Sequence, residues 1–171
     1  MGRPTRLPLL LLMLTGMSPA IATPAQANTA AASEPAFKHL LRALRFSQGE
    51  FSLILADCPD AEQRCHLTHQ LRERLSHRLQ DVTLPISAST LLSSLQSALN
   101  HPGDPDAVMV SGLEQVEDVV AVLCAANLTR NDLRRCCPLP LVLWVTPEIL
   151  RLLKRLAPDL SSWAAPVIRF A

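Results

Sequence analysis

Four polar residues follow short apolar stretches of the chain in a pattern that could form a ligand cleft. Asp57 and Asp60 come directly after one apolar run, and Ser111 and Glu114 come directly after another. Short apolar runs are typical of buried parallel strands, and the carboxyl ends of such strands meet at one edge of a sheet, where ligands bind. Carboxylates and a hydroxyl there could bind a small polar ligand, and Glu114 could act as a general base. The plainer interpretation of Glu114 is a solvated residue at the start of a helix.

The loop at residues 57–63 lacks the parts of a phosphate-binding loop. Such a loop needs glycines, so that main-chain N–H groups can wrap the phosphates, and a lysine to meet their charge. The segment has neither residue type, and three of its side chains are acidic. A magnesium-dependent nucleotide site usually has an acid at the end of a neighbouring strand, where this chain has Ser111. We therefore expect no nucleotide hydrolysis, and the sequence indicates no cofactor and no catalytic residue.

A metal site is the other chemistry that these side chains could support. Cys65 and His69 lie one helical turn apart and could share a metal ion with Cys58 nearby. Metal sites usually combine paired ligand clusters at tight spacing, and no second cluster follows. We therefore interpret these residues as surface side chains and expect no metal. Cys136 and Cys137 are adjacent, a spacing at which a disulfide is strained, so the five cysteines do not resemble a disulfide scaffold.

Apolar runs and amphipathic stretches alternate along most of the chain. The runs, which we expect to be strands, occupy residues 51–56, 82–86, 107–110, 141–145 and 167–170. Helical stretches lie between them, and one helix beginning near Ala36 precedes them. Strand–helix alternation predicts a parallel sheet covered on both faces, and right-handed crossovers make it three-layered. The predicted fold is an α/β three-layer sandwich with a five-stranded parallel sheet, preceded by one extra helix.

Three of the predicted helices have specific signals. One helix begins at Pro59 and Asp60, and its apolar stripe consists of Leu67, Leu71, Leu75 and Leu79. A second has its apolar face at Val116, Val119, Val120, Leu123 and Cys124. A third begins at Thr146 as N-cap, with Pro147 at its first position.

The first 27 residues have the features of a secretory signal peptide. Arg3 and Arg6 precede an apolar run at residues 7–17 that is too short to span a bilayer. Ala25 and Ala27 then form the small-x-small pattern of a cleavage site. We predict cleavage after Ala27 and export to the periplasm or medium, with no stable membrane span afterwards.

The rest of the chain is long enough for one domain. We expect a flexible leader at residues 28–35, with residues up to 33 contacting nothing, and a single domain at 36–171. The alternative to export is a cytoplasmic protein with a misassigned start, and an uncleaved anchor is a further alternative. The formal net charge of +1 provides no strong field for nucleic acid, so we expect no nucleic-acid partner.

Several stretches resemble a known family. They are LLRAL (40–44), SQGEF (47–51), PLVLWVT (140–146), APDLSSW (157–163) and IRF (168–170). Together they resemble the N-terminal region of bacterial tetratricopeptide-repeat proteins, a degenerate P-loop ATPase-like domain related to signalling ATPases with NACHT or NB-ARC modules. The resemblance covers about residues 37–171, and Trp144 and Trp163 are its most telling residues. It implies a P-loop NTPase-like core acting as a regulatory or scaffolding module, with no nucleotide-site residue of the family placed here.

Two functions of different classes follow from these observations. The first is a non-catalytic P-loop-NTPase-like domain that acts as a protein-interaction or regulatory module with a protein partner. The alternative is a small exported enzyme or ligand-binding protein, in which Asp57, Asp60, Ser111 and Glu114 line a cleft at the carboxyl edge of the sheet. A third possibility is the remnant of a longer repeat protein.

Overall fold

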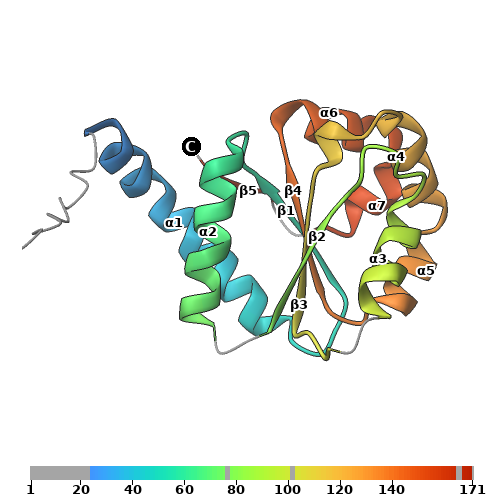
Figure 1. Cartoon of the computed structure of the whole chain (residues 1–171), viewed down its shortest axis with the longest axis horizontal. Coiled ribbons are helices and arrows are strands. Elements are labelled where there is room, and N and C mark those ends of the chain that lie inside the picture. The colour runs from blue at the N-terminus through green and yellow to red at the C-terminus, as the bar shows by residue number, and fades with distance from the viewer. Residues whose placement is uncertain (1–23, 76–77, 101–102, 165–166, 171) are drawn as a thin grey trace, which may run out of the picture.

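A five-stranded parallel sheet is the centre of the structure, a computed structural model that describes residues 24–75, 78–100, 103–164 and 167–170, with side chains from Ser33 onward (Figure 1). The strands are β1 (Ser52–Asp57), β2 (Leu79–Thr83), β3 (Ala107–Ser111), β4 (Pro140–Val145) and β5 (Ile168–Arg169). Their order is β2-β3-β4-β1-β5, and each neighbouring pair is parallel.

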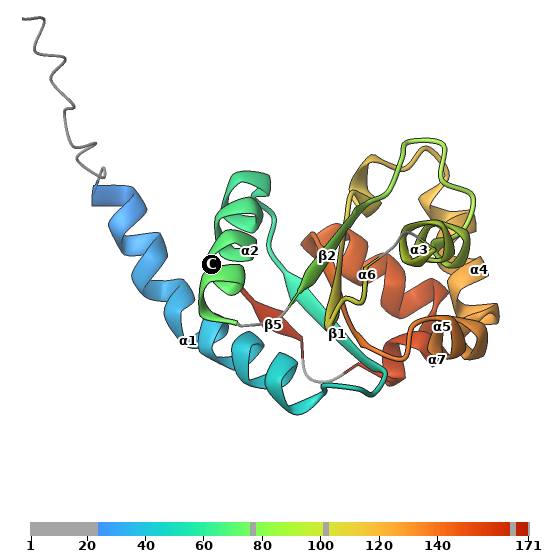
Figure 2. The ribbon, with the colours of Figure 1, turned by 60° about the horizontal axis from the view of Figure 1, so that its bottom comes forward.

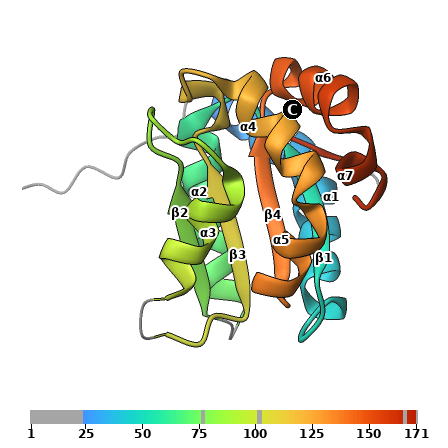
Figure 3. The same ribbon diagram turned by 90° about the vertical axis from the view of Figure 1, so that its right-hand side faces the viewer.

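The helices cover both faces of this sheet. α1 (Pro24–Phe46) and α2 (Ala61–Arg74) lie on one face. The opposite face is covered by α3 (Leu91–Leu99), α4 (Val119–Leu128), α5 (Arg130–Cys136), α6 (Pro147–Leu156) and α7 (Pro158–Ser162). Figure 3 shows these helices from the side, with β2 at the margin of the sheet. The three-layer sandwich that the sequence predicts, with one extra helix before it, is therefore confirmed.

The two faces divide the apolar residues of each strand by alternation. In β4 all six residues are buried, with Val142 and Trp144 against α1 and α2, and Leu141 and Leu143 against the other helices. This is the pattern of a parallel strand that is covered on both sides. In β2 only Val82 is buried, because this strand lies at the end of the sheet.

β2 begins and ends earlier than the sequence predicts. α2 ends at Arg74, so Leu79 does not continue its leucine stripe but begins β2 and pairs with Ala107. The expected strand at residues 82–86 is therefore wrong by three residues. Proline has no N–H for a strand ladder, so the strand ends before Pro85, and Ile86 beyond it is 65% exposed.

α1 begins well before Ala36. It starts at Pro24 and includes residues 28–35, where we expect a leader, because this segment is rich in alanine, the strongest helix former. Figures 1 and 2 show its first turns projecting beyond α2. Ser33 is buried and accepts a hydrogen bond from Gln63 of α2 at 3.0 Å, so the expectation that residues up to 33 contact nothing is wrong there. Residues 1–23, with most of the signal-peptide-like segment, lie outside the described residues.

Side-chain caps fix the starts of four helices. The caps are Asp60 for α2, Thr90 for α3, Asp118 for α4 and Thr146 for α6, and each accepts a hydrogen bond from a main-chain N–H of its helix. The predicted cap at Thr146 is confirmed. The predicted face of this segment is right in part: Leu123 of α4 and Val116 before it are buried, whereas Val120 is 47% exposed. α4 also buries Val122 and Ala126. Within the described residues, no helix is both long enough and apolar enough to cross a membrane.

Gly112 makes a tight turn possible directly after β3. Its φ is 90°, and it caps the short 3-10 helix η1 (Leu113–Gln115). A Cβ atom at this position would lie 3.1 Å from the carbonyl oxygen of Leu84 and 3.3 Å from its nitrogen. Only glycine satisfies both the dihedral angle and the close approach.

We predict that Gly112→Ala lowers the free energy of unfolding by about 2–3 kcal/mol, the cost of a strained left-handed residue together with a main-chain clash. Gly49→Ala is the matched control, because Gly49 also has a positive φ of 77°, but a Cβ atom there would meet no other atom within 4 Å. It should cost about 1 kcal/mol. Urea unfolding of both variants measures the difference, and equal losses would contradict the clash.

Candidate functional site

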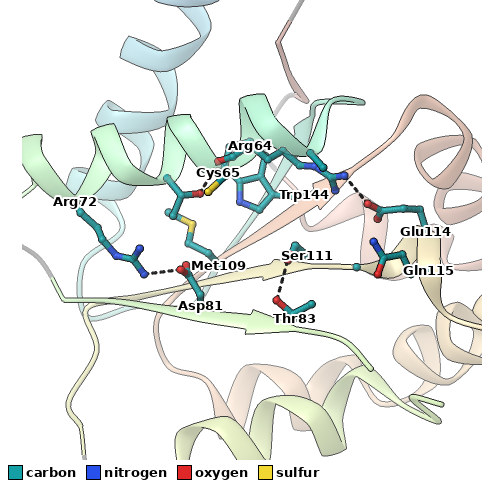
Figure 4. Close-up of a pocket in the computed structure, with 13 residues that line it drawn as sticks. Arg64, Cys65, Arg72, Asp81, Thr83, Met109, Ser111, Glu114, Gln115 and Trp144 are labelled. Atoms are coloured by element: carbon teal, nitrogen blue, oxygen red, sulfur yellow. Dashed lines mark hydrogen bonds and ion pairs between the residues drawn. The ribbon is translucent and has the colours of Figure 1, made fainter. Parts of the chain in front are cut away.

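A pocket of about 260 Å³ lies between α2 and the strands β2, β3 and β4 (Figure 4). Met109 and Trp144 form its apolar floor on the sheet. α2 contributes Arg64, Cys65, Thr68 and Arg72, and the opposite side is formed by Asp81, Thr83, Ser111 and Glu114. The pocket therefore has an apolar base and a rim of charged and hydroxyl groups.

A buried ion pair closes one end of this pocket. Nη2 of Arg64 donates to Oε1 of Glu114 at 2.5 Å, and the two side chains are 9% and 21% exposed. Arg64 comes from the first turns of α2, and Glu114 comes from η1, which the turn at Gly112 places beside β3. The pair thus joins the helix after β1 to the loop after β3.

This ion pair is held by a single contact. Nη1 of Arg64 and Oε2 of Glu114 are buried and have no hydrogen-bond partner among the described residues. Buried polar groups without partners cost free energy, and a bidentate arrangement would have satisfied both atoms. One donor and one acceptor therefore remain unused beside the pocket.

A second ion pair lies at the other end of the pocket. Arg72 of α2 pairs with Asp81 of β2, and both side chains are nearly half exposed. Between the two pairs, the hydroxyl groups of Thr83 and Ser111 lie 3.4 Å apart. Figure 4 shows both ion pairs bridging from α2 across the pocket.

Only two of the four residues predicted to form a cleft line this pocket. Ser111 and Glu114 do, whereas Asp57 and Asp60 are not among its lining residues. Asp57 is buried at the end of β1, where Oδ2 lies 3.7 Å from Nε of Arg169 and Oδ1 has no partner in the described structure. Asp60 caps α2 by accepting from the N–H groups of Glu62 and Gln63 at 2.8 and 3.4 Å.

The loop after β1 is held by a chain of polar contacts. The Cys58 thiol donates to Oε1 of Gln63 at 3.1 Å, and Nε2 of Gln63 donates to Ser33 of α1. Burial raises the pKa of the Cys58 thiol to about 11, so this sulfur remains a neutral donor at physiological pH. Burial likewise raises the pKa of Cys137 to about 11.

The cysteines and histidines considered as metal ligands are dispersed. Cys58 is buried beneath the loop and Cys65 is exposed, while His69 lies 3.4 Å from Glu73 on the surface of α2. In the part of the chain that the structure describes, no three His, Cys, Asp or Glu side chains form a group that could hold a metal ion. All five cysteines are free.

Sequence reasoning missed Arg64, Arg72, Asp81 and Thr83. A signal for Arg64 was present, because it stands three residues before Leu67 and seven before Leu71, on the buried stripe of α2. An arginine on an apolar stripe needs a buried partner. Asp81 lay between the predicted helix stripe, which ended at Leu79, and the predicted strand at 82–86. Thr83 lay inside that strand and was not singled out.

We predict that Glu114→Ala lowers the free energy of unfolding by about 2–3 kcal/mol, because it leaves the Arg64 charge buried without a partner. Adding Arg64→Met should recover part of this loss, because the double variant buries no charge. Urea unfolding of the two single variants and the double variant measures the coupling.

The exposed pair provides the matched control for this prediction. Asp81→Ala removes one partner of an ion pair on the same helix, and it should cost less than about 1 kcal/mol. Equal losses for Glu114→Ala and Asp81→Ala would show that burial does not strengthen the Arg64–Glu114 contact.

Comparisons with solved structures give distant likenesses. No protein-family model and no curated protein matches the chain. Among solved structures, it is similar to a chain in the structure of Drosophila ORC bound to AT-rich DNA and Cdc6, with 13% identity, a TM-score of 0.47 and coverage of 85% of this chain and 30% of that one. It is also similar to the Aeropyrum pernix ORC2 protein in its ADPNP-ADP complexes, with 12% identity, a TM-score of 0.42 and coverage of 89% and 49%. The chain thus spans less than half the length of either matched chain.

Proposed function

We propose that the chain is a non-catalytic, P-loop-NTPase-like domain that acts as a protein-interaction or regulatory module. The observation that carries this proposal is the cap on α2. The Asp60 carboxylate accepts hydrogen bonds from the N–H groups of Glu62 and Gln63. The helix after β1 therefore begins with its anion-binding position occupied by the chain's own carboxylate.

This cap opposes phosphate binding in two ways. Free N–H groups at a helix N-terminus are what bind a phosphate, and two of those in α2 are already used. The carboxylate also places a negative charge where the phosphate charge would lie. Glycine and lysine, which would supply further N–H groups and a positive charge, are missing from residues 57–63.

The Arg64–Glu114 pair opposes metal binding at the same edge of the sheet. The loop after β3 is where a nucleotide-hydrolysing site usually holds magnesium, and its acid here, Glu114, is engaged by a guanidinium. A paired carboxylate is a poor general base and a poor metal ligand, because either role requires breaking a buried ion pair. Two N–H groups of α2 and one oxygen of Glu114 are therefore engaged by the chain itself at this edge.

The alternative, a small-ligand or enzyme site at this edge, has less support. It requires Asp57, Asp60, Ser111 and Glu114 in one cleft, whereas two of them line the pocket and two are held elsewhere. Exposed apolar side chains instead favour contact with a protein. Ile86 and Val120 lie on adjoining segments, since the Glu117 N–H donates to the carbonyl of Ile86 at 2.9 Å.

We predict that isothermal calorimetry with ATP or GTP and magnesium detects no binding at micromolar nucleotide. The physical reason is that the α2 cap and the acidic loop repel the phosphates and occupy their donors. Micromolar affinity for either nucleotide would overturn the proposal.

Two variants test whether the cap is the cause. Asp60→Gly releases the N–H groups of α2, and it should produce weak, millimolar binding of inorganic pyrophosphate. Asp60→Ser is the control, because serine keeps a capping oxygen on those groups, and it should bind no pyrophosphate. Equal behaviour of the two variants would assign the exclusion to the rest of the loop.

Export is a separate part of the proposal. Arg3, Arg6 and the apolar run that follows, with Ala25 and Ala27, support a cleaved signal peptide. We predict that N-terminal sequencing of the protein expressed from its native start gives a mature chain beginning at Asn28. A chain that keeps Met1, or one that accumulates inside the cell, would contradict export.

A further inference from the structure

We propose that the free edge of β2 is a docking site for an extended segment of a partner protein, which adds to the sheet as a further strand. This inference rests on the proposed role as a protein-interaction module and names the surface for it. β2 is the terminal strand of the sheet, and in the described residues no strand pairs with its outer side.

The main chain of β2 presents hydrogen-bonding groups on that outer side. The Leu84 N–H donates to the carbonyl of Ser111 at 2.9 Å, which sets the phase of the ladder with β3. Because successive residues of a strand direct their N–H and C=O groups to opposite sides, Leu79, Asp81 and Thr83 direct theirs outward. The Asp81 carbonyl has a contact from the Gln80 side chain at 3.4 Å, a long contact that an incoming N–H could replace.

Hollows lie beside this edge on both faces of the sheet. On the α3 side, an open groove of about 510 Å³ has Val82, Ala88 and Ala98 together with serines of α3 and the preceding loop. On the α2 side lies the pocket of about 260 Å³ with its two ion pairs. Asp81 and Thr83 border both hollows. An added strand alternates its side chains between the two faces of a sheet, so each hollow would receive every second side chain.

The two hollows define the chemistry of the segment. The groove on the α3 side has no charged lining residue except Asp81 and is otherwise lined by hydroxyl-bearing and small apolar residues, so it suits a small uncharged side chain. On the α2 side both ion pairs are internally neutral, so an additional charge would be left unpaired. Nη1 of Arg64 and Oε2 of Glu114 are buried, so an incoming side chain does not reach them. We therefore expect a segment whose side chains are uncharged on both faces of the sheet.

A partner segment fits this edge better than a second copy of the chain. A two-fold pairing of β2 with itself would bring α3 against its own copy, and the exposed residues of α3 beside the groove include Ser93 and Ser97. Homodimer interfaces are more apolar than this. The half-exposed Asp81 on the edge also discourages indiscriminate pairing between sheets, while a peptide can meet it with a polar side chain.

The test uses the full chain and a display library of short random peptides, with affinities of selected peptides measured by fluorescence anisotropy. Thr83→Pro removes an outward N–H and places a ring on the edge, while the inner ladder keeps its Leu84 N–H. We expect it to weaken a selected peptide by about tenfold or more, the effect of losing roughly one well-placed contact. Thr83→Val keeps the N–H and should stay within about threefold of the unaltered chain.

Two further measurements protect the test against a variant that fails to fold. N-methylation of the peptide leaves the protein unchanged. Methylation of the amides that face β2 should abolish binding, whereas methylation of the alternate amides, which face away from β2, should leave binding intact. Hydrogen exchange should show slower exchange at Leu79, Asp81 and Thr83 when the peptide is bound.

Each other outcome overturns the inference in a recognisable way. A selected peptide that binds Thr83→Pro as well as the unaltered chain would place the interaction elsewhere, while the role as an interaction module survives. A library that yields no binder would exclude the β2 edge as a peptide site. The proposed function would still be tested separately by nucleotide calorimetry. Concentration-dependent dimerisation that Thr83→Pro abolishes would replace the partner with a second copy.

Discussion

The buried contact between Arg64 and Glu114 is the constraint on which this edge of the sheet depends. Bringing two charges out of water is expensive unless they meet, so α2 and the turn after β3 must be placed within hydrogen-bonding distance of one another. The turn satisfies this requirement through Gly112, whose left-handed φ carries the chain from β3 into η1. α2 satisfies it through Asp60, which fixes the start of the helix and hence the position of Arg64 within it.

Other side chains at the carboxyl edge of the sheet also contact one another. Cys58, Gln63 and Ser33 form a polar chain that ties the loop after β1 to α1. Ligands of open parallel sheets bind beyond the carboxyl ends of the strands, and that binding requires groups left free by the fold. Here two N–H donors of the α2 N-terminus and one oxygen of Glu114 are already engaged by the chain itself, which leaves fewer groups for a ligand.

Periodicity made the fold predictable and the site only half predictable. Apolar runs such as residues 141–145 identify buried strands without help from tertiary contacts, and their alternation with helices defines the layers. The position of β2 was not readable, because Leu79 continues a leucine spacing that the helix itself does not follow. Strand pairing with β3 decides that boundary, and it is a long-range interaction. Ser111 and Glu114 were found from their place after a strand. Asp57 instead lies near Arg169 and Asp60 caps α2, and the sequence pattern does not show these local roles.

The two edges of the sheet are protected to different degrees, and this asymmetry bears on function. β5 has two residues, pairs with the end of β1 and contacts α1, so this edge strand is very short. β2 is longer and lies at the margin of the sheet in Figure 3. Its half-exposed Asp81 places a charge on this edge. Among the described strands, β2 therefore offers main-chain hydrogen-bonding groups on its outer side, beside the pocket and the groove. The place where a partner would bind is therefore argued from this strand, whereas the cap on α2 argues against phosphate binding.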